Sequence, residues 1–151
     1  MYITTEQLQL GFSKLILTQL SNDDPRATEP DLKVVEMAVK LACERIDAAL
    51  RSRYMLPLAQ VPTSLFLYAE CLARYWLYGR RPETKMPETV KENFKWAVSE
   101  LEKIQSGKLH LGVAELGSHS AESTVENRGD LLPDNNEYEV RSPSRIDTSG
   151  Y

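Results

Sequence analysis

The sequence feature that most constrains the fold is a connector, residues 51–62, with two prolines five positions apart. Pro57 and Pro62 cannot both lie inside a helix, because each lacks a backbone N–H and restricts the residue before it. The connector also carries more large apolar side chains than a loop in water would. We therefore predict an extended strap that joins two helices and packs across them. These apolar residues are Tyr54, Met55, Leu56, Leu58 and Val61.

The segment that follows, residues 64–78, is apolar on nearly every side when it is drawn as a helix. Such a helix is central, with neighbours around most of its circumference. Thr63 or Ser64 is the expected cap. Glu70 and Arg74 stand four residues apart and form the one charged strip. They indicate either a partly shielded ion pair within the chain or a contact with another subunit.

Four further segments have helical spacing. Residues 6–10 and 12–20 form short helices separated at Gly11, and residues 32–53 form a long amphipathic helix capped by Asp31. Residues 88–105 carry a narrow apolar seam and end at a Ser-Gly stop signal. Trp96 falls outside this seam, so it lies at the core edge or on a partner-facing surface. The expected core combines Val39, Ile46, Leu65, Leu72, Trp76, Phe94 and Leu101.

Beyond residue 107 the composition changes. Apolar and polar residues alternate over 108–113, which predicts a strand or hairpin segment within 108–117. Residues 118–151 are polar and lack an apolar period, so we expect a flexible tail that is disordered in the free protein. The predicted fold class is all-α: a small helical bundle of about four helices over residues 1–107, with a short β-like segment and a flexible C-terminal tail.

Charge is unevenly placed along the chain. Residues 1–107 carry 14 basic and 14 acidic side chains, whereas residues 108–151 carry 4 basic and 8 acidic ones. A neutral body argues against a dedicated nucleic-acid binder, which needs a basic face. The N-terminus has no signal-peptide pattern. The longest apolar run is interrupted by charges and is shorter than the roughly 20 residues of a membrane span, so we expect a soluble protein made in a cytoplasm.

The residues that carry chemistry do not converge on a predicted site. His110 and His119 fall in the hairpin and tail regions, and Cys43 and Cys71 lack metal-ligand spacing. We expect two buried free thiols, with a Cys–His nucleophile pair as the weaker alternative. Phosphate-loop, GxSxG and HExxH motifs are absent from the sequence. We therefore predict a protein that is not an enzyme, with no catalytic, cofactor or metal residues.

Basic residues flank the helix ends near the connector. We expect them to gather there, either as a solvated face or as a contact to an acidic surface or to passing DNA. They are Arg51, Arg53, Arg80, Arg81 and Lys85.

Several short pieces together resemble a known family. An Arg53-Tyr54-x-Leu56-Pro57-Leu58 piece is followed by Val61-Pro62-x-x-Leu65 and by Ala73-Arg74-Tyr75-x-Leu77. Before them come Tyr2-Ile3-Thr4, Glu6-Gln7-Leu8 and Ile46-Asp47 with Leu50. This order resembles the head–tail connector, or head-completion, family of Mu-like phages and prophages. The resemblance covers roughly residues 1–107, and the tail matches only loosely, around Arg141 and Arg145.

The resemblance implies a helical subunit without enzymatic activity that assembles as a ring beneath the portal protein. Such a ring extends the DNA channel, passes DNA without sequence specificity and receives a tail-side neck or tail-terminator protein. The expected location is the virion neck, after assembly in the host cytoplasm, with no membrane partner. Residues assigned to contacts are Arg51, Arg53, Glu70, Arg74, Arg80, Arg81, Trp96, Arg141 and Arg145. The alternative is a stand-alone helical regulatory module that binds DNA or a protein.

Overall fold

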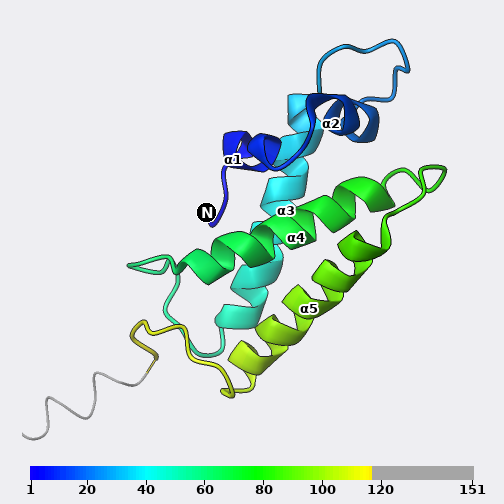
Figure 1. Ribbon diagram of the computed structural model, residues 1–151. Helices are drawn as coiled ribbons and strands as arrows, with labels where there is room; N and C mark the ends of the chain where they lie inside the picture. Colours follow the sequence, from blue (N-terminus) through cyan, green and yellow to red (C-terminus); the bar gives the residue numbers. More distant parts are fainter. Residues whose placement is uncertain (117–151) are drawn as a thin grey trace, which may run out of the picture. The chain divides into compact units, whose positions relative to one another are not determined.

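The computed structural model describes residues 1–116. Figure 1 shows a long helix, α3, crossed by α4, with α5 beside them and the short helices α1 and α2 against the N-terminal part of α3. The all-α prediction is confirmed for this part of the chain, while the predicted tail lies outside the described residues. The helices are α1 (Thr5–Leu10), α2 (Lys14–Ser21), α3 (Leu32–Leu50), α4 (Thr63–Gly79) and α5 (Glu88–Gln105).

The two short helices begin at side-chain caps. Thr4 and Gln7 form a reciprocal capping box at α1, in which each side chain accepts from the other residue's backbone N–H. Ser13 caps α2 by accepting from the Ile16 N–H. The sequence prediction started the second helix at Phe12. The helix begins two residues later, at Lys14, because Ser13 supplies the side-chain oxygen that caps a free backbone N–H of the first turn.

Helix α3 begins where the sequence predicted, at the Asp31 cap, whose carboxylate accepts from the Lys33 N–H. It ends at Leu50 rather than at Arg53, because residues 51–53 continue as turns. The predicted apolar stripe is buried except at Leu32, which is half exposed in the first turn, and at Ala49, which is partly buried. The buried members are Val35, Val39, Ala42, Ile46 and Leu50.

Helix α4 is central, as predicted: it contacts α2, α3 and α5. The predicted cap was wrong, since Pro62 occupies the N-cap position and no side chain bonds to the first turn. Proline suits this position because the backbone N–H it lacks would have no partner there. Buried residues surround most of the helix, and they are Leu65, Tyr68, Ala69, Cys71, Leu72, Ala73 and Leu77.

Helix α5 lies against α3 and α4 through its predicted seam. The predicted core is confirmed except at Trp76 and Phe94, which are only partly buried at its edge. Phe94 stacks on Tyr75, with 3.8 Å between ring centroids. The seam residues Val90, Ala97, Leu101 and Ile104 are buried.

The connector packs on the body through part of its length. Tyr54 is 1% exposed, and Leu56 and Leu58 pack partly against the core. Met55 is 70% exposed and Val61 48%, so these two residues depart from the strap prediction. The peptide bond between Leu56 and Pro57 is cis.

Residues 108–116 return along the connector. The predicted alternation of buried and exposed side chains is confirmed: Leu109, Leu111 and Val113 pack against the core, and the residues between them are exposed. The predicted strand is nevertheless replaced by one isolated antiparallel bridge, Tyr54 to Glu115, and no longer ladder forms within residues 1–116. Gly112, with φ of 73°, leaves the extended conformation partway along the segment.

Candidate assembly surface

A partly buried polar clasp holds residues 108–116 to the body. Arg53 donates from Nη2 to both carboxylate oxygens of Glu115, at 2.8 and 2.7 Å, and from Nη1 to the Ile104 carbonyl at 3.3 Å. The Leu116 N–H donates to the Arg53 carbonyl at 2.8 Å. The side chains of Arg53 and Glu115 are 19% and 25% exposed. This shielding gives the ion pair more weight than an exposed pair would have.

Tyr54 completes the clasp from inside. Its hydroxyl donates to Glu115 at 3.2 Å and accepts from the Leu111 N–H at 3.2 Å. His110 Nδ1 lies 2.7 Å from the same carboxylate. The hydrogen bonds from Arg53 hold the pKa of Glu115 below its usual value, and the bond from Tyr54 acts in the same direction.

A second arginine cluster closes the far end of α4. Arg80 donates to the carbonyls of Leu20 and Ser21 and forms two bonds, at 2.9 and 3.0 Å, with Asp23. Arg81 also contacts Asp23, at 2.9 Å, and donates to the carbonyl of Asn22. These guanidinium groups satisfy carbonyls at the C-terminus of α2, where positive charge is favoured.

Glu70 and Arg74 form the predicted ion pair, at 2.8 Å. Arg74 also donates to the Gly11 carbonyl at 2.6 Å and lies over the Phe12 ring, 4.5 Å from its centroid. The pair therefore ties the junction between α1 and α2 to the central helix. The alternative, a contact with another subunit, stays a prediction.

The predicted gathering of basic residues was wrong. Arg53 lies at the start of the connector and Arg80 at the opposite end of α4. A helix of 17 residues is about 25 Å long, so the two clusters are separate. Arg51 has no ion-pair partner within residues 1–116, Lys85 is exposed, and Arg141 and Arg145 lie outside the described residues.

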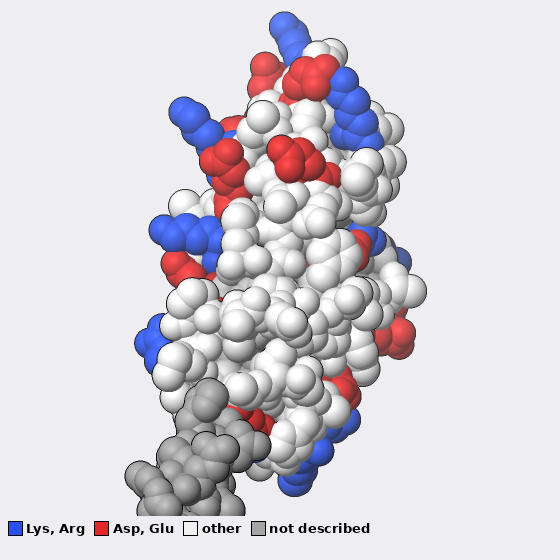
Figure 2. Space-filling view, turned by 90° about the vertical axis from the view of Figure 1, so that its left-hand side faces the viewer, with Lys and Arg blue, Asp and Glu red and all other residues white. Residues whose placement is uncertain are grey.

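One face of the described unit has few charges at its centre. Figure 2 shows this face, with lysine, arginine and acidic side chains concentrated towards its edges. It is the side on which the N-terminus, α1 and the connector lie in Figure 1. A groove of about 590 Å³ opens here between the connector, the N-terminus and α3. The side chains of Met1, Met55, Val61 and Leu116 line it while remaining 48–79% exposed.

We call this the connector groove. Its two charged lining residues, Asp47 and Arg51, are spaced four apart on the last turn of α3 and just after it. Asp47 accepts a short hydrogen bond from the Tyr2 hydroxyl. Burial, and then this bond, raise the pKa of Tyr2.

A second apolar opening, which we call the helix cleft, lies among α3, α4 and α5. It has a volume of about 240 Å³ and is almost entirely apolar apart from Arg45. A neighbouring groove between α3 and α5 shares Arg45 and adds Glu102. Arg45 has no ion-pair partner within the described residues. The apolar lining of the helix cleft is Leu41, Ala42, Leu72, Tyr75, Trp76 and Phe94.

The connector groove and the helix cleft open on opposite sides of α3. Arg45 lines the cleft, whereas Asp47, two residues further along α3, lines the connector groove. An offset of two residues turns a helix by about 200°. The described unit therefore presents two different apolar surfaces that face away from one another across one helix.

Catalytic geometry was not expected from the sequence. Residues 1–116 contain no cluster of three or more side chains suited to hold a metal ion. Cys71 is buried, and burial raises the pKa of its thiol. Cys43 is only half-buried, contrary to the expectation of two buried thiols. His110 belongs to the clasp, and His119 lies outside the described residues.

Sequence reasoning missed the two apolar openings. It placed Met55 and Val61 in a packed strap, whereas both side chains are exposed beside Pro57 and Pro62. Leu41 was outside the expected apolar stripe of α3, and Arg45 was grouped with the charged residues away from that stripe. Trp96 is 43% exposed, and its ring lies edge-to-face with Tyr68 at 5.3 Å, so its role on a partner-facing surface stays a prediction.

Comparison with known proteins identifies the family. The sequence profile of the family described as "Bacteriophage Mu, Gp36" matches residues 2–128. The chain belongs to this family. Within it, the Mu-like prophage FluMu protein gp36 of Haemophilus influenzae is 30% identical over 115 residues, which cover 76% of this chain and 78% of that relative.

A second relative is Gene product J of Escherichia phage Mu. It is 28% identical over 121 residues, which cover 80% of this chain and 83% of that protein. The family match places the chain among the proteins of Mu-like phages and prophages and supports the phage part of the resemblance noted in the sequence. None of the helices in residues 1–116 has the length and apolar content needed to span a bilayer.

Proposed function

We propose that this chain is a structural subunit of the phage neck. In this proposal it is a head–tail connector that assembles as a ring beneath the portal protein, extends the DNA channel and receives a tail-side neck or tail-terminator protein. Family membership supports a phage role. The sequence resemblance supports the connector role.

The observation that carries the proposal is the pair of apolar surfaces on opposite sides of α3. A subunit with two different apolar surfaces can bind one neighbour through each of them, head to tail. Such contacts close into a ring when the rotation from one subunit to the next adds up to a full turn. Four exposed apolar side chains gather around one groove, and an exposed apolar patch of this kind marks a protein–protein contact. The balanced charge of residues 1–107 suits DNA passage without sequence-specific binding and disfavours the alternative of a DNA-binding regulator.

The experiment is a nonsense mutation in the gene of the phage or prophage, complemented from a plasmid. We expect separate heads and tails by negative-stain electron microscopy and joined particles after complementation. Purified protein mixed with portal rings should add a ring of density below the portal. Joined virions in the absence of the protein would refute the connector role. A change in the gel mobility of DNA or of a repressor on adding the protein would favour the regulatory alternative.

A truncation that keeps residues 1–117 gives a further prediction. The described core lies within residues 1–116, so we expect nearly unchanged thermal stability. We also expect the truncated protein to fail to join heads to tails, because the segment 118–151, with Arg141 and Arg145, is proposed to dock on neighbouring subunits or on the portal during assembly. Melting curves and in vitro complementation of tailless heads measure these outcomes. An unfolded truncation would make the tail part of the folding unit, and an active truncation would remove its proposed role.

A further inference from the structure

We propose that neighbouring subunits meet by inserting the Met55 side of the connector groove of one copy into the helix cleft of the next copy. The occupant of the cleft is thus a second copy of this chain. The inference rests on the proposed ring and specifies which two surfaces of the subunit form it.

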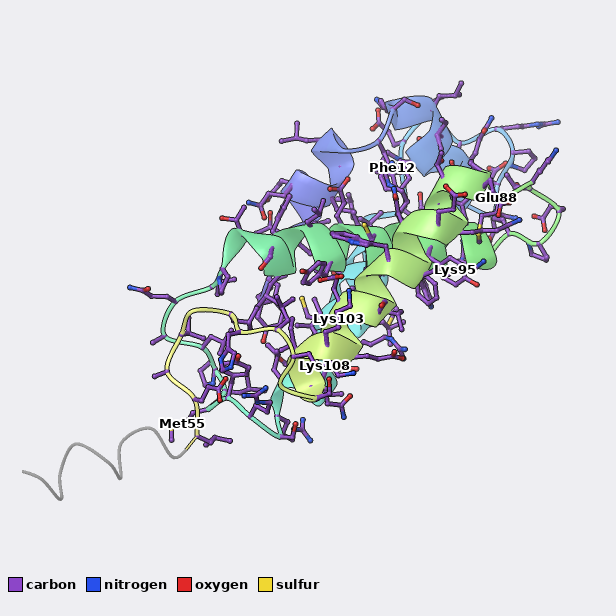
Figure 3. The ribbon with its side chains drawn as sticks, turned by 60° about the horizontal axis from the view of Figure 1, so that its bottom comes forward. Phe12, Met55, Glu88, Lys95, Lys103 and Lys108 are labelled. Carbon is purple, nitrogen blue, oxygen red and sulfur yellow. The ribbon has the colours of Figure 1, made fainter. Side chains whose placement is uncertain are left out.

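Shape and chemistry match at this contact. Met55 is 70% exposed, and Figure 3 shows it at the outer edge of the connector, away from the labelled lysines of α5. A methionine side chain is unbranched and adapts to irregular apolar openings. The helix cleft of about 240 Å³ offers such an opening, walled by Leu41, Trp76 and Phe94 among others. Insertion would cover apolar surface on both copies.

Charge complementarity supports the same pairing. The connector groove carries Asp47 and Arg51, while the cleft and its neighbouring groove carry Arg45 and Glu102. Arg45, Arg51 and Glu102 have no side-chain ion pair within residues 1–116. In the proposed contact, Arg51 of the connector groove faces Glu102 in the groove beside the cleft, and Asp47 faces Arg45. Complementary charges at the rim of an apolar contact set its register.

The position of the two surfaces gives the contact its symmetry. Because they lie on opposite sides of α3, one copy can receive a neighbour on each side at the same time. A two-fold contact built on the connector groove would instead set that groove against the same groove of the second copy. Asp47 and Arg51 would then face the same two residues, and the helix cleft would stay uncovered. The head-to-tail arrangement satisfies both surfaces and repeats from copy to copy.

The first test is photo-cross-linking in assembled particles. A diazirine amino acid replaces Met55 in the full-length chain, and the same substitution at Leu15 is the matched control, since both positions are 70% exposed. We expect position 55 to cross-link to peptides of α4 or α5 in a second copy and position 15 to give no such product. Cross-links from position 55 to another virion protein, or none to a second copy, would overturn the inference.

The second test is a charge exchange between Arg51 and Glu102. Both side chains are exposed and lack ion-pair partners within the described residues, so R51E and E102R should stay folded. R51E should show a small loss of stability, because it places a glutamate at the C-terminus of α3, four residues after Asp47. Each single variant juxtaposes like charges at every contact, so we expect at least about a tenfold loss of assembled rings. The double variant R51E/E102R should recover to within about threefold of wild type. A double variant as defective as the single ones would contradict the pairing.

These tests separate the two proposals. If wild-type particles contain rings of this protein but the position-55 cross-link and the charge rescue both fail, the ring stands and the assigned surfaces are wrong. If purified particles contain no copies of the protein, the proposed function fails and this inference fails with it.

Discussion

Two leucines of α4 provide a quantitative test of how the core is closed. Leu65 is fully buried and lines none of the openings described above, whereas Leu72 is 4% exposed and forms part of the wall of the helix cleft. Replacing either by alanine removes about three methylene equivalents. The transfer cost is therefore the same at both positions, about 2.4 kcal/mol. The difference between the two variants comes from the space left behind.

At Leu65 that space is enclosed. At about 24 cal/mol per Å³, a cavity that cannot be filled adds about 1–2 kcal/mol, so we expect L65A to cost about 4 kcal/mol. At Leu72 the space joins an opening that already reaches solvent. The cavity cost is then largely absent, and we expect L72A to cost about 2.5 kcal/mol.

The measurement is urea denaturation of both variants and wild type, followed by far-ultraviolet circular dichroism. The dependence of the free energy of unfolding on denaturant should stay constant across the three proteins, so that the midpoints report stability. A cost below 1 kcal/mol for L72A would show that α4 is not the central helix. A cost for L72A equal to or above that for L65A would show that the helix cleft is closed in solution.

Two further predictions concern the clasp and the turn beside it. Because Arg53 holds the pKa of Glu115 below its usual value, the stabilisation from this ion pair is present above about pH 4.5 and is lost as the pH falls through the lower pKa of the folded state. Wild type should thus exceed E115Q in unfolding free energy at pH 7 and converge with it in acid, and a constant difference between pH 7 and acid would contradict this reasoning. A methyl group at Gly107, where φ is 79°, would overlap Arg53, so G107A should lose about 1–2 kcal/mol or more. The control G79A meets no atom within 4 Å and should be neutral or gain about 0.5 kcal/mol in the same urea experiment; equal effects would refute the strain argument.

The helices were predictable because their signals are local. The Asp31 cap, the 4-3-4-3 seam of α5 and the Ser-Gly stop act within a few residues of the backbone they organise. The same holds for the connector, since proline excludes helix whatever surrounds it. These signals fixed the all-α class and the centrality of α4 before any contact between distant residues was known.

Tertiary structure decided how the charged and apolar side chains are used. Arg53 and Arg80 look alike in sequence, yet one binds a carboxylate 62 residues later and the other a carboxylate 57 residues earlier. Met55 and Leu56 are adjacent apolar residues, yet one is exposed and the other packs on the core. Hydropathy gives each residue a preference, but burial depends on which distant segments arrive beside it. Local sequence therefore determined the helices, whereas the approach of segments far apart in the chain determined the clasp, the connector groove and the helix cleft.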